Sequence, residues 1–159
     1  MRNAESFWIL GILVAVPLAA RPQLQPFGGR VRSPVVHGCH DRTVLTLRNE
    51  GSTRASYRIR WLASDGAPLG RSEPRSLESE ALAELDIAAL AESTGIVAKA
   101  SQVEIDWVSE RFTRVVAAAA MVPRRACESH ELASTRPIPV EIEGPRLIRW
   151  AEFQAVSRE

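Results

Sequence analysis

Both cysteines and all three histidines of this 159-residue chain fall in two short clusters. The first cluster is His37-Gly38-Cys39-His40 and the second is Cys127-Glu128-Ser129-His130. Thiols and imidazoles can form a disulfide, hold a soft metal ion or supply a nucleophile and a base, so these clusters offer the most specific chemistry in the sequence. In an exported chain an even number of cysteines is usually oxidised, which favours a disulfide between Cys39 and Cys127.

A metal site is the alternative interpretation of the same residues. Two thiolates and two or three imidazoles suit zinc or copper, and the candidate ligands are His37, Cys39, His40, Cys127 and His130. The spacing His37-x-Cys39 places both side chains on one face of a strand, and Cys127-x-x-His130 can close around one ion. The spacing matches no zinc-finger signature, and free thiols beside polar histidines are a third possibility.

No catalytic motif accompanies these clusters. The sequence has no Gly-x-Ser-x-Gly elbow, no phosphate-binding glycine loop and no His-Glu-x-x-His motif. Glu104 and Asp106 lie two residues apart and would form a carboxylate pair on one strand face, but a solvated face explains the same spacing. The histidines could act as general bases, yet no motif in the sequence identifies a nucleophile near them. The sequence therefore predicts a protein that is not an enzyme and that has no cofactor, apart from the zinc or copper alternative. A small hydrolase with a divergent motif is a third possibility.

The charge balance argues against a nucleic-acid partner. Twenty Lys and Arg stand against 19 Asp and Glu, which leaves a net charge of +1. Nucleic-acid binding normally requires a basic excess or a basic stripe, and the arginines here are scattered among nearly as many acidic residues. A content of 45% apolar and 25% charged residues is ordinary for a globular protein.

The first twenty residues predict export. A polar start that contains Arg2 precedes an apolar run from Phe7 to Ala20, which is typical of a secretory signal peptide cleaved after Ala20. Fourteen residues rise about 21 Å as a helix, short of the roughly 30 Å hydrocarbon core of a membrane. Glu5 and Leu18 fit a cleaved signal poorly, so a retained N-terminal anchor remains the alternative. We expect a periplasmic or extracellular protein, anchored to the membrane if this segment is retained.

The elements that must position these residues are mostly strands. Residues 21–34 contain three prolines and two adjacent glycines, which predicts a linker, and the folded part begins near Val35. Turn-forming residues such as Asp65-Gly66 separate the strands, and a helical turn follows near residues 88–92. Residues 103–107 and 112–122 are interpreted as a hairpin whose second arm is covered on both faces. Strands are predicted over 31–37, 43–49, 55–63, 77–87, 103–107 and 112–122.

The C-terminal residues 128–159 are predicted to be an extension of the domain. Three prolines interrupt regular structure there, although Val140-Glu141-Ile142 could add an edge strand. Residues 147–156 predict either a short amphipathic helix, with Leu147, Ile148, Ala151 and Phe153 directed inward, or a frayed terminus.

Aromatic and basic residues alternate along the predicted strands. Their alternation places Tyr57, Trp61 and Trp107 in the core, and Phe112 is expected to join them. The opposite face of residues 55–63 would carry Arg58, Arg60 and Leu62, either solvated or in contact with a partner. In the tail, Trp150 and Phe153 are the candidates for an exposed apolar anchor. The possible partner surface therefore consists of Arg58, Arg60, Leu62, Trp150 and Phe153.

Three segments have turn and core residues in a characteristic order. They are Thr43-Val-Leu-Thr-Leu-Arg-Asn-Glu-Gly-Ser52, Tyr57-Arg-Ile-Arg-Trp-Leu-Ala-Ser-Asp-Gly66 and Leu85-Asp-Ile-Ala-Ala-Leu90. This arrangement resembles the immunoglobulin-like and fibronectin-like domains of bacterial envelope proteins over residues 35–122. The resemblance implies parallel pairing of 31–37 with 112–122, which would bring Cys39 and Cys127 to the same end of the domain.

These observations together predict an all-β protein, an immunoglobulin-like antiparallel β-sandwich of about seven strands over residues 35–127, with a short C-terminal extension. The resemblance implies a spacer, adhesion module or accessory subunit. We expect a non-catalytic structural or protein-interaction module of the cell envelope. Its partner would be another envelope or extracellular protein, bound by surface complementarity or by strand addition at a sheet edge. We expect no nucleic-acid partner, and membrane contact only through an uncleaved leader.

Overall fold

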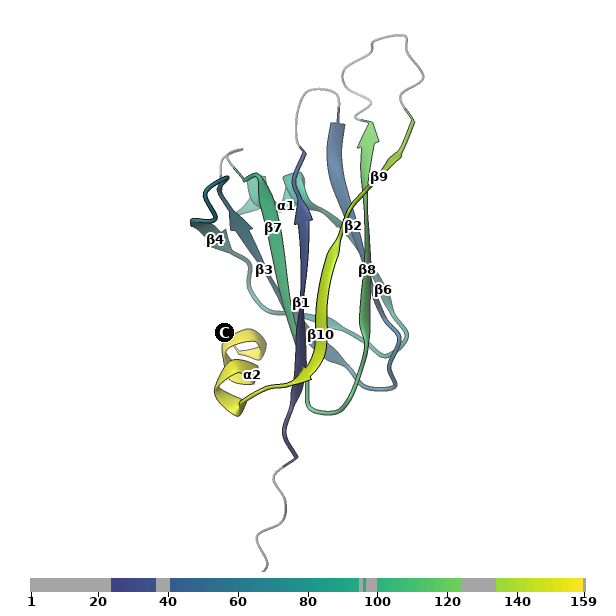
Figure 1. The fold of residues 1–159 in the computed structure, drawn as a ribbon, viewed down its shortest axis with the longest axis vertical. Coiled ribbons are helices and arrows are strands. Elements are labelled where there is room, and N and C mark those ends of the chain that lie inside the picture. The colour runs from purple at the N-terminus through teal and green to yellow at the C-terminus, as the bar shows by residue number, and fades with distance from the viewer. Residues whose placement is uncertain (1–23, 37–40, 95, 97–99, 124–133, 159) are drawn as a thin grey trace, which may run out of the picture.

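The computed structural model describes residues 24–36, 41–94, 96, 100–123 and 134–158. These residues form two antiparallel β-sheets that pack face to face, so the predicted all-β sandwich is confirmed (Figure 1). The first sheet, sheet A, has the order β10-β1-β7-β3-β4, with β5 also paired to β3, and the second, sheet B, has the order β6-β2-β8-β9. The strands are β1 (Phe27–Pro34), β2 (Asp41–Asn49), β3 (Ala55–Leu62), β4 (Pro68–Arg71), β5 (Arg75–Leu77), β6 (Leu82–Asp86), β7 (Gln102–Ser109), β8 (Val115–Pro123), β9 (Arg136–Ile138) and β10 (Glu141–Leu147). The helices are α1 (Ile87–Ser93) and α2 (Trp150–Ser157).

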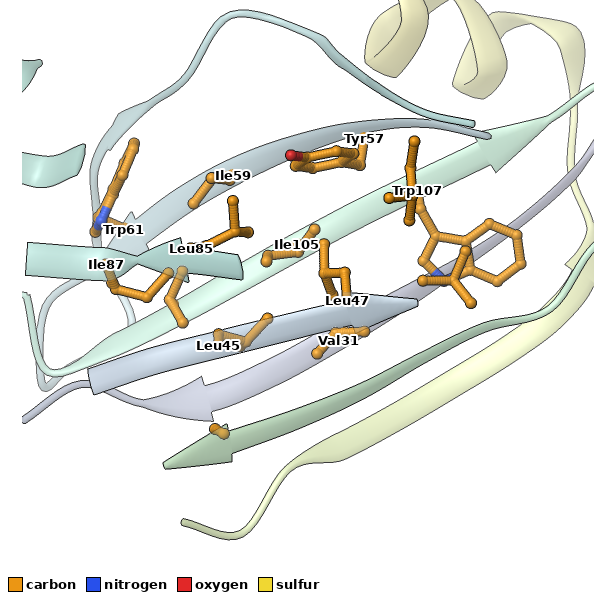
Figure 2. Close-up of a cluster of buried hydrophobic side chains, with 14 of the residues drawn as sticks. Val31, Leu45, Leu47, Tyr57, Ile59, Trp61, Leu85, Ile87, Ile105 and Trp107 are labelled. Atoms are coloured by element: carbon orange, nitrogen blue, oxygen red, sulfur yellow. The ribbon is translucent and has the colours of Figure 1, made fainter. Parts of the chain in front are cut away.

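The core lies between the two sheets and is built from residues that alternate along each strand (Figure 2). Because successive side chains of a strand point to opposite faces, the period-two pattern of β3 and β7 directs one set inward. Three predicted core aromatics are confirmed, since Tyr57, Trp61 and Trp107 are all buried. Phe112 is not a core residue, because it lies on the connection after β7 and is exposed. The fully buried side chains include Val31, Leu45, Leu47, Ile59, Trp61, Ile87, Val103, Ile105 and Trp107.

The linker predicted over residues 21–34 is wrong from Phe27 onward. Residues Phe27–Pro34 form β1, which lies inside sheet A between β7 and β10. Gly28 and Gly29 suggested flexibility, but here they permit close packing. A Cβ atom on Gly29 would lie 2.6 Å from Cζ2 of Trp107 and would overlap the carbonyl oxygen of Glu143. These glycines therefore let two neighbouring segments approach the strand.

The hairpin predicted between residues 103–107 and 112–122 is also wrong. β7 pairs with β1 and β3 in sheet A, whereas β8 pairs with β2 and β9 in sheet B. Residues 110–114 therefore cross from one sheet to the other. The strand β8 is not covered on both faces, because Ala118 is exposed. A run of alanines is apolar enough to resemble a buried strand and small enough to face solvent.

The predicted C-terminal extension is part of the sandwich. β9 pairs with β8 in sheet B, and after Pro139 and Val140 the chain continues as β10, which pairs with β1 in sheet A. The last strand segment thus passes from one sheet to the other along one side of the molecule (Figure 1). The edge strand expected near residues 140–142 is confirmed, and the sandwich extends well beyond the predicted boundaries 35–127.

Both predicted helical segments are present. α1 begins after Asp86, whose carboxylate accepts a 3.1 Å hydrogen bond from the backbone N–H of Ala89, as expected for an N-cap. α2 follows β10, with Ile148 buried beside its start, but Leu147 and Ala151 are exposed rather than directed inward. The short helix α2 lies on the outer face of sheet A, against β3 and β7 (Figure 1).

Candidate functional site

The cysteine and histidine clusters lie outside the described residues. This applies to all five candidate ligands, His37, Cys39, His40, Cys127 and His130, and therefore to the predicted disulfide. Within the described residues, no group of three or more His, Cys, Asp or Glu side chains could hold a metal ion. The predicted parallel pairing of 31–37 with 112–122 is wrong, because β1 lies between β7 and β10 and is antiparallel to both. However, β2 and β8 pair with Asp41 opposite Pro123. The segments that contain the two cysteines are therefore connected in sequence to two residues that lie opposite each other in sheet B.

The outer face of sheet A carries a regular arrangement of charges across four strands. The register places Arg32 opposite both Glu104 and Glu141, and it places Arg60 opposite Glu104 on the other side. Two residues along, a second row repeats the same signs. We call these eight residues the charge ladder: Glu141, Arg32, Glu104 and Arg60 in one row, and Glu143, Arg30, Asp106 and Arg58 in the other. Because neighbouring strands present opposite charges, each cross-strand pair is attractive.

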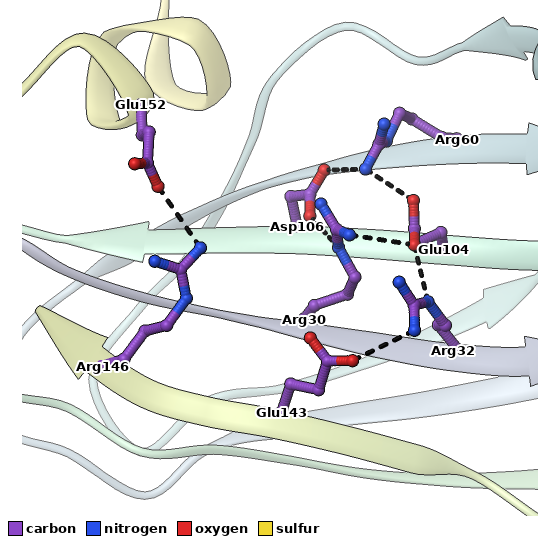
Figure 3. Close-up of polar contacts among 8 residues, drawn as sticks. All are labelled: Arg30, Arg32, Arg60, Glu104, Asp106, Glu143, Arg146 and Glu152. Atoms are coloured by element: carbon purple, nitrogen blue, oxygen red, sulfur yellow. Dashed lines mark hydrogen bonds and ion pairs between the residues drawn. The ribbon is translucent and has the colours of Figure 1, made fainter. Parts of the chain in front are cut away.

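Glu104 is the centre of this ladder (Figure 3). Its Oε2 accepts a 2.7 Å hydrogen bond from Nε of Arg32 and lies 3.3 Å from Nη1 of Arg30. Its Oε1 forms an ion pair with Nη2 of Arg60. The Glu104 side chain is only 6% exposed, whereas each of the three arginine side chains keeps about a third of its surface exposed. One nearly buried carboxylate is therefore neutralised by three guanidinium groups that reach the surface.

Asp106 repeats this arrangement in the second row. Its Oδ1 accepts a 2.7 Å bond from Nε of Arg30, and its Oδ2 lies 2.8 Å from Nη2 of Arg60. Arg32 also donates from Nη1 to Glu143 at 3.0 Å. Arg30 and Arg60 thus each bind both carboxylates of β7 and connect the two rows.

The charge ladder raises the pKa of one of its arginines, Arg32. The hydrogen bond to Glu104 raises the pKa of Arg32 above the usual guanidinium value; burial opposes this shift, and the nearby carboxylates support it. Both Glu104 and Asp106 contact two or more guanidinium groups. The carboxylate pair suggested by the sequence is thus part of an ion-pair network.

A hollow of about 600 Å³ lies at one end of the charge ladder. Arg32, Arg60 and Glu104 form its polar side, and Leu62 lies beside them. Its rim includes Pro34, Pro68, Pro139, Gln102 and Glu141. The hollow therefore combines guanidinium groups that are already held in place with rigid apolar rings.

The helix α2 covers the other end of the charge ladder. Arg58 is 8% exposed and donates from Nη2 to the backbone carbonyl of Arg158, the residue that follows α2. A cation at this position interacts favourably with the negative end of the helix dipole. Arg146 and Glu152, which are 3.3 Å apart, connect β10 to the helix (Figure 3).

The five residues of the predicted partner surface lie in two places. Arg60 and Leu62 line the hollow, and Arg58 lies beneath α2. Trp150 and Phe153 belong to α2 itself, where their rings contact each other edge to face with centroids 5.2 Å apart. Of the five, Arg60 and Leu62 are therefore the two that line the hollow together.

Sequence reasoning missed Arg30, Arg32, Glu141 and Glu143. Arg30 was assigned to a linker and Glu143 to an extension, and although Arg32 and Glu141 fell in predicted strand segments, neither was named as a site residue. One signal could have found them, because all four strands of the ladder carry two like charges at a spacing of i and i+2. This spacing puts both charges on one face, so four such pairs with alternating sign predict neighbouring strands.

Comparisons with known proteins give no relative. No protein-family model, no curated protein and no solved structure matches the chain. No helix among the described residues is both long and apolar enough to cross a membrane.

Proposed function

We propose that this protein is an exported, non-catalytic interaction module of the cell envelope, and that it binds another protein through the charge ladder and the adjoining hollow. The observation that carries the proposal is the fixed geometry of Arg30, Arg32 and Arg60 around Glu104. The β-sandwich, the predicted leader and the resemblance to envelope immunoglobulin-like domains are all compatible with it.

Arginine side chains that are held in a fixed geometry indicate a binding surface rather than residues that only keep the protein soluble. A flexible charged side chain loses rotamer freedom when a partner immobilises it, which costs about 0.5–1.5 kcal/mol for each side chain. Arg30 and Arg60 each contact two carboxylates before any partner arrives, so much of this loss has already occurred on folding. Each guanidinium has five N–H donors, and those that the carboxylates leave free can bind an acceptor on the partner.

The alternating charges also restrict the partner. A surface of single sign would attract any oppositely charged molecule, whereas this ladder alternates in sign from β10 to β3. Only a partner with a matching alternation can bring its charges close without repulsion. Leu62 and the proline rings would accept an apolar side chain of the same partner.

The sheet edges favour binding through the outer face of sheet A over binding by strand addition. Among the described residues, the edge strands β4, β5, β6 and β9 are three to five residues long. The longer edge strand β10 contains Pro145, which has no backbone N–H to donate. Short or interrupted edges resist pairing with another chain. Surface complementarity is thus the better supported of the two predicted mechanisms.

Site-specific photo-crosslinking in the native host tests the proposal. A photoreactive residue at Leu62, beside the hollow, is expected to trap one partner protein. The same residue at Leu82 is the control, because Leu82 is exposed, whereas Leu62 is half-buried, and Leu82 lies on β6 in the other sheet. Crosslinking at Leu62 should disappear when Glu104→Gln disturbs the arginines in a folded protein. Equal products from both positions, or none from Leu62, would contradict the proposed site.

A zinc or copper site remains a second candidate function. The pairing of Asp41 with Pro123 supports it, because segments joined to adjacent residues can bring the two cysteine clusters together. The same pairing supports the disulfide equally. Intact mass of the exported protein, measured under native and denaturing conditions without reductant, separates the two. A loss of two hydrogens identifies the disulfide, whereas a reduced chain with bound zinc or copper in the native state identifies the metal site.

A further inference from the structure

Exposed apolar side chains gather at the end of the sandwich where the described chain begins. We call this cluster the apolar pole; it consists of Leu24, Phe27, Phe112, Leu147 and Trp150. Four of these residues keep large exposed fractions, at 74% for Leu24, 62% for Phe112, 56% for Leu147 and 39% for Trp150. The residues come from three separate parts of the sequence, so their exposure belongs to one surface and not to one terminal segment.

Contacts show that the apolar pole is continuous. The rings of Phe27 and Phe112 meet edge to face, with centroids 5.4 Å apart. Leu147 is the register partner of Phe27 across β1 and β10. Leu24 and Trp150 line one hollow of about 330 Å³ together with Arg111, which precedes Phe112 in the chain.

Two basic side chains, those of Arg111 and Arg149, adjoin the apolar residues. Arg111 borders the hollow beside Glu110, and Arg149 precedes Trp150 at the start of α2. Both arginines are exposed, and neither makes an ion pair within the described part of the chain. Exposed tryptophan and phenylalanine beside unpaired arginine are typical of surfaces that lie in the interfacial region of a membrane.

The position of the apolar pole indicates what covers it. β1 begins at this end of the molecule, at the bottom of Figure 1, and Leu24 is the first described residue. The apolar run of the sequence ends at Ala20, and the four peptide links from Ala20 to Leu24 can span at most about 14 Å. A bilayer that holds the apolar run would therefore lie within reach of the pole.

We infer that the apolar pole is a membrane-contact surface, which rests on the bilayer next to the N-terminal apolar segment. Trp150 and Phe112 insert at the level of the lipid headgroups, and Arg111 and Arg149 interact with anionic lipid. This contact holds the sandwich upright on the membrane and leaves the charge ladder, which lies further along the sandwich, accessible to a partner. The inference does not depend on the proposed protein-binding function.

Tryptophan quenching by brominated lipid tests this contact. The full chain with Trp8→Phe is reconstituted into vesicles of phosphatidylethanolamine and phosphatidylglycerol, with or without bromine on the acyl chains. Three tryptophans remain, of which Trp61 and Trp107 are buried and Trp150 is exposed. Bromine is expected to quench only the part of the emission that the further change Trp150→Phe removes.

Two matched substitutions test whether the quenching depends on the apolar pole or on any exposed apolar side chain. Phe112→Ser should reduce the quenching, whereas Leu82→Ser should leave it unchanged, since Leu82 is 61% exposed but lies on β6. Both side chains are exposed, so both variants should fold, which circular dichroism checks. Absence of quenching in vesicle-bound protein, or an equal effect of both substitutions, would overturn the inference. Self-association that Phe112→Ser abolishes, without quenching, would show that a second copy covers the pole instead.

Discussion

The hydroxyl of Thr113 donates a 2.6 Å hydrogen bond to Oδ1 of Asn49, and both residues are completely buried. The amide nitrogen of Asn49 lies within hydrogen-bond distance of three backbone carbonyl oxygens, those of Thr53, Leu77 and Glu78. One side chain at the end of β2 therefore connects the exit of that strand to β5 and to the crossing from β7 to β8.

Removal of Asn49 should destabilise the sandwich much more than removal of its partner hydroxyl. Asn49→Ala leaves several buried backbone groups unpaired, so we expect a loss of about 2–4 kcal/mol in the free energy of unfolding. Thr113→Val keeps the shape and removes one hydrogen bond, for an expected loss of about 1 kcal/mol. Urea unfolding curves measure both values. A Thr113→Val loss as large as that of Asn49→Ala would contradict the central role of the amide.

Glu104→Gln should destabilise the protein more than Asp106→Asn. Both changes remove one negative charge from the ladder and keep the shape, but Glu104 is 6% exposed with three guanidinium neighbours, and Asp106 is 20% exposed with two. Because the arginines can turn toward water, we expect a loss of about 1–3 kcal/mol for Glu104→Gln, below the value for a fully buried pair.

Urea unfolding at low and high salt tests this comparison. Salt screens exposed charges more than buried ones, so the difference between the two variants should persist at high salt. Equal losses that both vanish at high salt would mean that the network is an ordinary set of surface ion pairs.

The strands that sequence analysis predicted correctly share one physical property. In β2, β3 and β7 one face packs into the core between the sheets, and the alternation of apolar and polar residues therefore indicates the direction of each side chain. The alternation of apolar and polar residues is weaker in β1, because Gly28 and Gly29 have no side chains. Glycine is required there because Trp107 and Glu143 pack against the strand. Both residues are distant in sequence, so the local sequence of β1 could not predict this requirement.

The candidate site was only partly predictable for a related reason. Arg58, Arg60 and Leu62 were assigned correctly to the face opposite the core, because this assignment follows from β3 alone. The partners of Arg60 depend on the order of strands in the sheet, which alternation within a strand does not determine. A helix was one of the two interpretations of residues 147–156, but the packing of α2 over Arg58 was not predicted, because it depends on the fold placing this helix against β3.

Gly29→Ala should strongly destabilise the protein, although alanine is normally tolerated in a strand. The added Cβ would overlap the carbonyl oxygen of Glu143 and approach Cζ2 of Trp107, so either β10 or a core indole must move. Gly66→Ala is the control, because its Cβ would meet nothing within 4 Å and only the positive φ of 81° opposes it. We expect about 1–2 kcal/mol for the control, a value typical of an alanine forced to positive φ, and a larger loss for Gly29→Ala. If residue 29 belonged to a flexible linker, its substitution would leave the thermal midpoint unchanged.

Tyr57 should ionise at a higher pH in the folded protein than in the unfolded chain. Burial raises the pKa of its phenol, and Arg75, its register partner on β5, opposes the shift without cancelling it. The folded state therefore binds the proton more tightly, so the stabilising contribution is complete below the unfolded pKa of about 10 and is lost as the pH rises through the folded pKa. Because Tyr57 is the single tyrosine of the chain, the ultraviolet absorbance of phenolate reports this group alone. Titration in buffer should give a higher midpoint than titration in concentrated urea, and Tyr57→Phe should remove this alkaline signal. Coincident midpoints in buffer and urea, with the protein still folded in buffer, would mean that the phenol is not buried between the sheets.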